Sequence, residues 1–367
     1  MSWHTGRLGD VITLKRGHDL PDTKRQDGDV PVVSSSGITG YHNEPKAMAP
    51  GVVTGRYGTL GEVFYVEEDY WPLNTALYVT DYKGNHPRFV AYFLKNILRN
   101  YQSDKAAVPG VNRNVLHELK VRTADPKSQI RIADILSAYD GLIENNRRRM
   151  ALLEELARQL FREWFVRLRF PGHEHTRITN SVPEGWGRET LGDLAKITMG
   201  QSPESKYYNE DGEGLPFHQG VTDFGARFVT HRIYTTALNR IGEPGDILCS
   251  VRAPVGRLNV TLDKIVIGRG LAALRSKTGR QSLLLQQLRA HFFKEDLIGG
   301  GAIFASVTKK EFSAQEILEP SERLKQSFEE VTRPCDEQLR VLHLQNQQLR
   351  TARDLLLPCL MIGEISV

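Results

Sequence analysis

Two segments of the chain carry apolar side chains at alternating steps of three and four residues. In the first, these positions are Leu136, Tyr139, Ile143, Met150, Leu153, Ala157, Leu160 and Trp164, with Asn146 as the polar member. In the second, they are Cys335, Leu339, Leu342, Leu349, Leu356 and Leu360, with Asn346 and Arg353 as polar members. Such steps form the heptad seam of a coiled coil. The pattern therefore predicts two long helices.

Proline and glycine residues indicate where these helices begin and end. Pro126 follows Asp125 at a suitable first helical position, because proline has a fixed φ and its missing N–H is not needed there. The Phe-Pro-Gly sequence at 170–172 predicts the end of the first helix. In the second segment, Pro334 interrupts the start of the pattern and Pro358 lies near its end. We therefore expect the second helix to be less regular in its N-terminal part.

The two helices are expected to pair with each other as an antiparallel coiled coil. The segment between them can return the second helix beside the first, and an intramolecular pair escapes the concentration dependence of dimerisation. Roughly 35 residues at about 1.5 Å each give a rod of about 50 Å. The alternative is two independent amphipathic helices, each packed on its own domain. The predicted pairing residues are Ile143, Asn146, Met150, Leu153 and Leu160, with Leu339, Leu342, Asn346, Leu349 and Leu356.

One asparagine interrupts each apolar seam. A buried asparagine usually fixes register or partner choice at some expense of stability. Asn146 and Asn346 can therefore pair with each other, or each can meet another chain. The alternative is that both face solvent at frayed positions.

The chain that precedes the first helix is repeated before the second. The Leu-Gly-Asp motif at 8–10, followed by a glycine at 17, returns at 191–193, followed by a glycine at 200. A glycine-bounded run at 51–61 likewise finds a counterpart at 245–256. This unit is longer than the roughly 20 to 50 residues of a solenoid repeat. The sequence therefore predicts a tandem duplication of one domain and one helix.

Both repeated domains contain short β-rich runs bounded by glycines, together with one helical segment. The fold class is α+β, with two similar mixed α/β domains each followed by a long helix. The expected strands are 30–33, 51–54, 62–66 and 77–80 with a helix at 88–98, then 215–217, 233–236, 246–250, 258–262 and 271–274 with a helix at 282–293. The expected boundaries are domain one 1–125, helical spacer one 126–170, linker 171–184, domain two 185–319 and helical spacer two 320–360.

Composition restricts the class of protein further. The chain has 367 residues, of which 40% are hydrophobic and 25% charged, and no apolar run approaches the roughly 20 residues of a membrane span. The start of the chain lacks the pattern of a secretory signal, and Cys249, Cys335 and Cys359 are widely spaced, which favours a reducing compartment. We expect a soluble, cytoplasmic protein without a membrane partner. A net charge of +4 is compatible with a nucleic-acid partner without requiring one.

Several predicted surface loops carry side chains suited to base edges and phosphates. Arginine reads guanine, asparagine and glutamine read adenine, and lysine mainly holds phosphate. Arg56 and Arg252 are taken as equivalent positions of the two copies, each ahead of a glycine. The alternative is that each arginine braces its own loop. The candidates are Ser34, Ser35, Ser36, Arg56, Tyr57, Asn112, Arg113 and Asn114 in the first copy, and Gln219, Arg252, Ser306, Thr308, Lys309 and Lys310 in the second.

With its repeated openings, two variable domains and two helical spacers, the chain resembles the specificity subunit of type I restriction-modification enzymes. The Pro-Glu-Gly-Trp entry at 183–186, the run at 130–137 and the Arg-Asp-Leu-Leu-Leu-Pro run at 353–358 match that family. The resemblance implies two target recognition domains, each reading one half of a split DNA target, and helices that set the gap between the halves. It also implies that two methyltransferase (M) subunits dock on the helices and that restriction (R) subunits join them.

The resemblance places catalysis and cofactors on those partner subunits. S-adenosylmethionine, ATP and Mg²⁺ are expected there, whereas this chain is expected to be a non-catalytic subunit without a cofactor or metal. It lacks the Gly-x4-Gly-Lys-Ser/Thr loop and the Asp-Pro-Pro-Tyr type of motif. Asp22, Glu44 and Lys46 only loosely resemble a nuclease metal site. A free-standing sequence-specific DNA-binding protein and a coiled-coil protein-interaction scaffold remain the alternatives.

Overall fold

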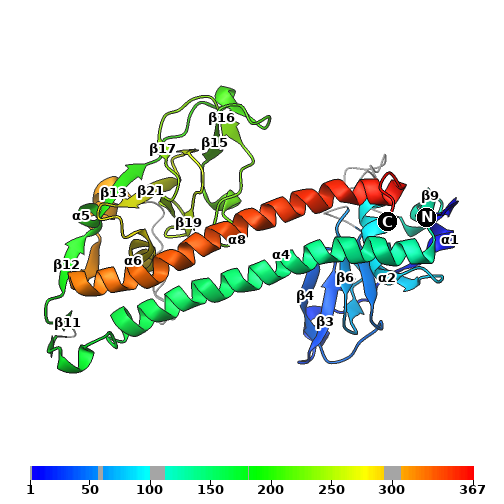
Figure 1. Cartoon of the computed structure of the whole chain (residues 1–367), viewed down its shortest axis with the longest axis horizontal. Coiled ribbons are helices and arrows are strands. Elements are labelled where there is room, and N and C mark those ends of the chain that lie inside the picture. The colour runs from blue at the N-terminus through cyan, green and yellow to red at the C-terminus, as the bar shows by residue number, and fades with distance from the viewer. Residues whose placement is uncertain (1, 57–60, 100–111, 181, 293–306) are drawn as a thin grey trace. The chain divides into compact units, whose positions relative to one another are not determined.

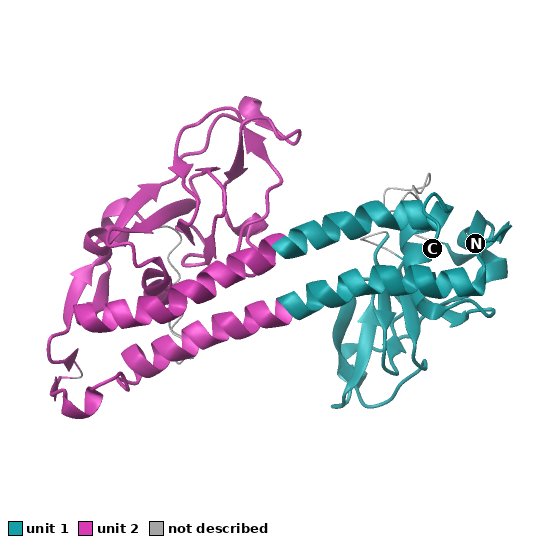
Figure 2. Ribbon diagram, viewed as in Figure 1, with its two compact units in different colours: residues 1–146, 345–367 teal, residues 147–344 magenta. Residues whose placement is uncertain are grey.

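A computed structural model of the chain describes residues 2–56, 61–99, 112–180, 182–292 and 307–367. The chain divides into two compact units, residues 1–146 with 345–367 and residues 147–344 (Figure 2). Each unit contains one β-rich domain together with parts of two long helices, α4 (Pro126–Phe161) and α8 (Glu322–Ile362) (Figure 1). Among the described residues, no helix is both long and apolar enough to cross a membrane.

The first unit is built around a four-stranded antiparallel sheet in the order β2-β8-β5-β6, beside a three-stranded sheet in the order β4-β3-β7. A ribbon of β1 (Trp3–Arg7) and β9 (Lys120–Ala124) leads into α4. The short helices are α1 (Leu8–Val11), α2 (Pro87–Arg99) and α3 (Arg113–His117). The remaining strands are β2 (Thr13–Arg16), β3 (Val30–Ser34), β4 (Gly37–His42), β5 (Gly51–Gly55), β6 (Val63–Val66), β7 (Trp71–Pro72) and β8 (Ala76–Asp81).

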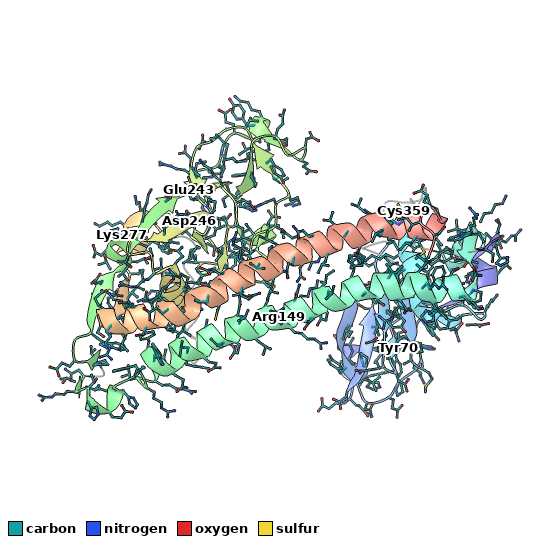
Figure 3. The ribbon with its side chains drawn as sticks, in the orientation of Figure 1. Tyr70, Arg149, Glu243, Asp246, Lys277 and Cys359 are labelled. Atoms are coloured by element: carbon teal, nitrogen blue, oxygen red, sulfur yellow. The ribbon has the colours of Figure 1, made fainter. Side chains whose placement is uncertain are left out.

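The core of the first unit forms where α2 covers this sheet. All five residues of β5 are buried, as expected for a central strand that packs on both faces. Phe89 and Leu94 of α2 share one apolar cluster with Leu77 of β8. Tyr70, labelled in Figure 3, belongs to a second cluster, and burial raises the pKa of its hydroxyl well above the usual value. The predicted strands and the predicted helix of this domain are therefore present.

The second unit repeats this plan. Its four-stranded antiparallel sheet has the order β13-β21-β18-β19, a five-stranded sheet has the order β14-β16-β15-β20-β17, and β12 pairs with β22 ahead of α8. The helices are α5 (Leu191–Leu194), α6 (Gln281–Phe292) and α7 (Lys309–Ser313). The strands are β10 (Ile178–Thr179), β11 (Val182–Pro183), β12 (Gly187–Thr190), β13 (Ala195–Met199), β14 (Tyr208–Asn209), β15 (Leu215–His218), β16 (Tyr234–Thr235), β17 (Ile241–Gly242), β18 (Ile247–Ser250), β19 (Leu258–Val260), β20 (Ile265–Ile267), β21 (Leu271–Ser276) and β22 (Glu316–Glu319).

Strand register shows which residues of the two copies are equivalent. Arg16 lies opposite Leu77 in the first sheet, as Met199 lies opposite Ala272 in the second. The four-stranded sheets have corresponding orders, which agrees with the predicted duplication. The segment between β15 and β18 carries two strands, β16 and β17, where the first copy has one strand, β4, between β3 and β5, so the second copy is more elaborate in this region.

Helices α4 and α8 pack against each other in antiparallel fashion in each unit. In the first unit, Leu136 shares an apolar cluster with Leu357. In the second, Leu153 packs in the cluster of Leu339, and the rings of Phe161 and Phe328 lie 5.9 Å apart. Within each unit, residue numbers rise along α4 as those of their partners fall along α8. The predicted antiparallel pairing is confirmed.

The predicted seam positions lie on the inward faces of these helices. Asn146 Nδ2 donates to Asn346 Oδ1 at 3.1 Å, and both side chains are buried, so the two asparagines meet each other rather than solvent. Arg353, the polar seam residue without an obvious partner in the sequence, forms ion pairs with Asp140 and Asp354. Of the other predicted pairing residues, three are buried (Ile143, Leu339, Leu342) and five are half-buried (Met150, Leu153, Leu160, Leu349, Leu356).

The ends of the helices differ from the sequence expectation in two places. α8 continues without a break through Pro334 and Pro358, although Pro334 was expected to disturb its start. Pro334 is exposed, so water can reach the backbone carbonyl that proline leaves without a donor, while buried Phe328 and Leu339 on either side hold the helix in place. The first helix ends at Phe161 and continues as a π-helical turn, Arg162–Val166.

Candidate nucleic-acid interface

Each β domain has one corner at which four backbone segments meet. These are the end of β2 or β13, the end of β3 or β15, the end of β5 or β18, and the turn before β8 or β21. A glycine permits the approach in both copies: a Cβ on Gly17 would lie 2.1 Å from the carbonyl oxygen of Leu73, and a Cβ on Gly200 would lie 2.1 Å from that of Gly268. Only a residue without a side chain fits there. The glycines repeated in the sequence thus shape equivalent corners.

The first corner consists of Arg16, Ser35, Arg56 and Asn74. The carbonyl oxygen of Asn74 accepts from Arg56 Nη1 at 3.1 Å and from Arg16 Nε at 3.4 Å. Asn74 Nδ2 donates to Asp19 Oδ1 at 2.7 Å, which holds the turn in place. Arg16 is exposed and Arg56 half-buried. Arg56 thus braces its own domain, as the alternative interpretation proposed, and the same turn brings a second guanidinium group beside it.

The serine run next to this corner has a mainly structural role. Ser34 is buried, and its Oγ donates to the carbonyl of Gly37 at 3.2 Å and accepts from the backbone N–H of Ser36 at 3.1 Å. These bonds form the turn between β3 and β4. The Ser34 hydroxyl is therefore used inside the turn, and a DNA contact by Ser34 stays a prediction. Ser35 is half-buried and Ser36 exposed.

The second corner consists of Gln219, Arg252, Arg269 and Gly270. Gln219, Arg252 and Gly270 line a pocket of about 160 Å³. The backbone N–H of Gly270 donates to the carbonyl of Gln219 at 3.1 Å, so the two segments are in contact. The side chains of Gln219, Arg252 and Arg269 are exposed. Gln219 and Arg252 were both predicted candidates, and the fold brings them together from positions far apart in the chain.

Hydrogen bonds hold the loop that carries Arg252 in place. Ser250 Oγ donates to the carbonyl of Pro254 at 2.5 Å and accepts from the backbone N–H of Arg257 at 2.9 Å. The segment before α7 joins the same loop, because the N–H of Val307 donates to the carbonyl of Val251 at 2.9 Å. The loop is therefore held on both sides while the Arg252 side chain stays exposed.

The remaining candidates lie at the starts of α3 and α7. Thr308 is the N-cap of α7 and forms a capping box with Glu311, so the Thr308 hydroxyl is used within the helix start. Lys309 and Lys310 are exposed. Asn112 caps α3 in the same way by accepting from the N–H of Asn114 at 2.9 Å. Arg113 and Asn114 are also exposed. Tyr57 and Ser306 lie outside the described residues.

The assumed equivalence of Arg56 and Arg252 is wrong. Gly55 lies opposite Ala76, and Ser250 lies opposite Leu271 at the corresponding place of the second sheet. The next residue after Gly55 is Arg56, whereas the next residue after Ser250 is Val251, so Arg252 is one position further along. The two glycine-bounded runs do not reveal this shift, because strand pairing and not glycine position sets the register.

Lysine and arginine side chains lie close to two histidines of the first β domain. Burial, then the charges of Lys15 and Lys46, lower the pKa of His18 below its usual value. Burial, then the charges of Arg113 and Lys83, lower the pKa of His117. Neighbouring cations therefore add to burial in disfavouring protonation of both imidazoles. Cations grouped in this way favour a polyanionic ligand.

The described residues contain no cluster of three or more His, Cys, Asp or Glu side chains that could hold a metal ion. In the weak nuclease pattern, Asp22 pairs with Arg25 at 2.9 Å, so its carboxylate already has a cation. The His-Glu-His run at 173–175 forms an exposed or half-exposed 3₁₀ turn.

Four residues of the corners were not among the candidates: Arg16, Asn74, Arg269 and Gly270. Arg16 and Asn74 are 58 positions apart, and their proximity depends on the glycine at 17. Arg269 stands between Gly268 and Gly270, and its backbone N–H donates to Ser202 Oγ at 3.2 Å. In the second copy, Arg269 occupies the position that Asn74 occupies in the first. A polar residue between two glycines is the sequence pattern that indicates this position.

The duplicated β domains and the antiparallel helix pairs define a protein of two similar modules, each with one β-rich domain and parts of two long helices. The family described as "Type I restriction modification DNA specificity domain" matches residues 1–155. The putative type I restriction enzyme MjaX specificity subunit of Methanocaldococcus jannaschii is 30% identical over 302 residues, which cover 78% of this chain and 70% of that protein. The chain therefore belongs to the family of type I restriction enzyme specificity subunits.

Two further comparisons agree with this membership. The type I restriction enzyme MjaIX specificity subunit of Methanocaldococcus jannaschii is 24% identical over 296 residues, 75% of this chain and 66% of that protein. The crystal structure of the S subunit of a type I restriction-modification system from M. genitalium has the same fold, with a TM-score of 0.63 and 16% identity over 98% of this chain and 96% of that one. Membership also supports the expectation of a non-catalytic subunit.

Proposed function

We propose that this chain reads a split, asymmetric DNA target, with one half-site for each β domain. One observation carries the proposal: the two domains share a glycine-shaped corner but place different side chains in it. Arg16 and Arg56 gather around Asn74 in the first corner, whereas Gln219 and Arg252 line a pocket in the second. A common frame with different polar contents is suited to two different base sequences.

The side chains divide by chemistry into base readers and phosphate binders. Arginine reaches guanine with two hydrogen bonds and glutamine reaches adenine, so Arg252 and Gln219 are suited to base edges in the major groove. Lysine mainly binds phosphate, which suits Lys309 and Lys310. The first half-site is assigned to Arg16, Arg56, Asn112, Arg113, Asn114, Ser35, Ser36 and Tyr57, and Thr308 and Ser306 border the second.

The helices are proposed to carry the partner subunits and to set the gap between half-sites. Ile135 and Leu142 of the first unit are exposed by 37% and 52% and are seven residues apart, so they lie on one face of α4. An exposed aliphatic stripe marks an interaction surface. We assign it to methyltransferase subunits, two per chain because the recognition module is duplicated, with restriction subunits binding through them.

The functional boundaries proposed for this assembly are recognition domains 1–125 and 185–319, helical spacers 126–170 and 320–360, and linker 171–184. S-adenosylmethionine, ATP and Mg²⁺ belong to the partner subunits. The assembly is proposed to act in the cytoplasm, in keeping with the three free cysteines of this chain.

The test compares half-sites in the assembled methyltransferase. Methylated adenines are first mapped with the unchanged complex to define the target. The double variant Gln219→Ala/Arg252→Ala is then tested on DNA with a base change in one half-site at a time. We expect lost discrimination, about 1 to 3 kcal/mol per bidentate contact, at one half-site only. Arg188→Ala, which removes another exposed arginine of the same domain, is the matched control. An unchanged target in the double variant would remove both residues from the site.

A further inference from the structure

A segment of the second β domain connects the pocket directly to the helix pair. Gln219 and Val221 line the pocket, and the chain then makes a 3₁₀ turn, Val221–Asp223. The next residues, 224–229, fold back on themselves, with a bridge between Phe224 and Val229. We call residues 224–229 the anchor loop. Fewer than ten residues separate the proposed base reader Gln219 from the centre of this loop.

Arg227 fastens the anchor loop to both helices of the unit. Its side chain is only 6% exposed. Its Nη2 donates to Asp336 of α8, and its Nη1 lies 3.6 Å from Glu154 Oε1 of α4. The neighbouring Phe228 packs its ring 4.8 Å from that of His343 on α8. The loop that follows the pocket therefore rests on two elements that are proposed to carry the partner subunits.

The carboxylates that receive Arg227 are shared with α6. Asp336 Oδ2 accepts from Ser282 Oγ at 2.6 Å, and Glu154 Oε2 lies 3.5 Å from Arg289 Nη2. Even so, Arg227 Nε and Glu154 Oε1 have no hydrogen-bond partner in the part of the chain that the structure describes. A buried charge network with unsatisfied atoms contributes little net stability, and its best-attested role is to fix position.

The first copy neutralises the equivalent acid in a different way. Both long helices begin alike, since Gln129 N donates to Asp125 O and Lys325 N donates to Ser321 O. Asp140 follows Asp125 by the same number of residues as Asp336 follows Ser321, so Asp140 is the counterpart of Asp336. Asp140 pairs with Arg353 of the opposite helix and accepts from the hydroxyl of Tyr92. In the first copy the cation is thus part of the helix pair, whereas in the second it comes from the recognition domain.

We propose that Arg227 is a positioning residue for the second half-site, an inference that rests on the proposed function. Buried as it is, Arg227 does not touch DNA. It fixes the anchor loop on α4 and α8, and through residues 219–223 it fixes the pocket that Gln219 and Arg252 line. The Arg227 connection lies entirely within the second unit, so it positions the second half-site and not the first.

The test uses the assembled methyltransferase and the mapped target. The variant Arg227→Met/Asp336→Asn removes an opposite pair of charges and keeps a polar partner for Ser282. Methylation rates are measured on the matched target and on targets with one base changed in either half-site. We expect the preference for the matched base to fall about tenfold in the second half-site, the loss of one base contact, and to stay within about twofold in the first.

The matched control is Arg353→Met/Asp140→Asn, the same change at the equivalent acid of the first copy. It is expected to leave discrimination in the second half-site unchanged. If the double variant at Arg227 does not fold, Arg227→Lys takes its place: it keeps the charge but loses the planar fork, and a smaller loss confined to the second half-site is expected.

Two results would overturn the inference: unchanged discrimination in the second half-site, or an equal loss in both half-sites, which a general loss of stability produces. These results are distinguishable from a failure of the proposed function. If Gln219→Ala/Arg252→Ala alters one half-site and the Arg227 variants do not, only the positioning role is wrong. If the unchanged complex methylates a continuous target, the proposed function itself is wrong.

Discussion

The buried pair of asparagines in the first unit gives the sharpest test of the helix packing. Asn146 and Asn346 are 7% and 4% exposed and share one hydrogen bond of 3.1 Å. Asn146→Ala removes one partner and leaves the other amide buried without a replacement from water. Leaving one buried polar group unsatisfied costs about 1 to 3 kcal/mol. We expect this loss in the free energy of unfolding of the unit.

The second half of the test replaces both asparagines. In Asn146→Leu/Asn346→Leu no polar group is left unpaired, and apolar side chains of similar size fill a seam that is otherwise apolar. Exchanging both partners in this way is nearly neutral or stabilising. We therefore expect the double leucine variant to be at least as stable as the unchanged chain, although the single alanine variant is less stable.

Thermal unfolding of the purified chain, followed by calorimetry, measures both variants. A change of about 1 kcal/mol shifts the midpoint of a domain of this size by a few degrees, which is readily resolved. An Asn146→Ala variant as stable as the unchanged chain would refute the pairing. A double leucine variant that loses as much as two separate alanine changes would refute it as well.

Three other predictions concern single positions. Hydrogen bonds from the N–H of Ser2 and from Ser128 hold the pKa of Asp125 well below its ordinary 3.8. The stability that these bonds give the folded chain is present above about pH 4 and is lost as the pH falls through the lowered pKa. Asp125→Asn should therefore remove this acid-dependent loss of stability, as measured by thermal unfolding. Burial lowers the pKa of His218 from 6.5 to about 4. Between these pH values the unfolded chain binds a proton on this imidazole that the folded chain does not, so the free energy of unfolding should fall as the pH drops from 6.5 towards 4, by at most about 3 kcal/mol. His218→Asn should reduce this dependence of stability on pH. Gly200→Ala should destabilise the second unit by at least about 2 kcal/mol because its Cβ meets backbone, whereas Gly187→Ala, with open space around it, should unfold at the same temperature as the unchanged chain.

The helices and the duplication could be predicted from the sequence because both are local patterns. The alternation of three and four residues identified α4 and α8 and placed the two asparagines on the seam. The same local reasoning failed at Pro334, where buried neighbours on both sides keep the helix continuous. Propensity was overridden there by packing.

The corners could be predicted only in part because they form by approach of distant segments. Gln219 and Arg252 were recognised one by one by side-chain type, but their common pocket depends on the contact between Gly270 and Gln219. Arg16 and Asn74 were missed because neither stands out locally. The false match of Arg56 with Arg252 had the same origin, since strand register is a property of the sheet and not of the run of glycines.

The most direct test of the central claim is a genome-wide map of methylated adenines in cells that contain this chain and its methyltransferase partner, with and without Gln219→Ala/Arg252→Ala. We predict a target of two defined halves separated by a gap of constant length, and an altered second half with an unchanged first half and gap in the variant. A continuous target, or a variant that changes both halves, would contradict the account.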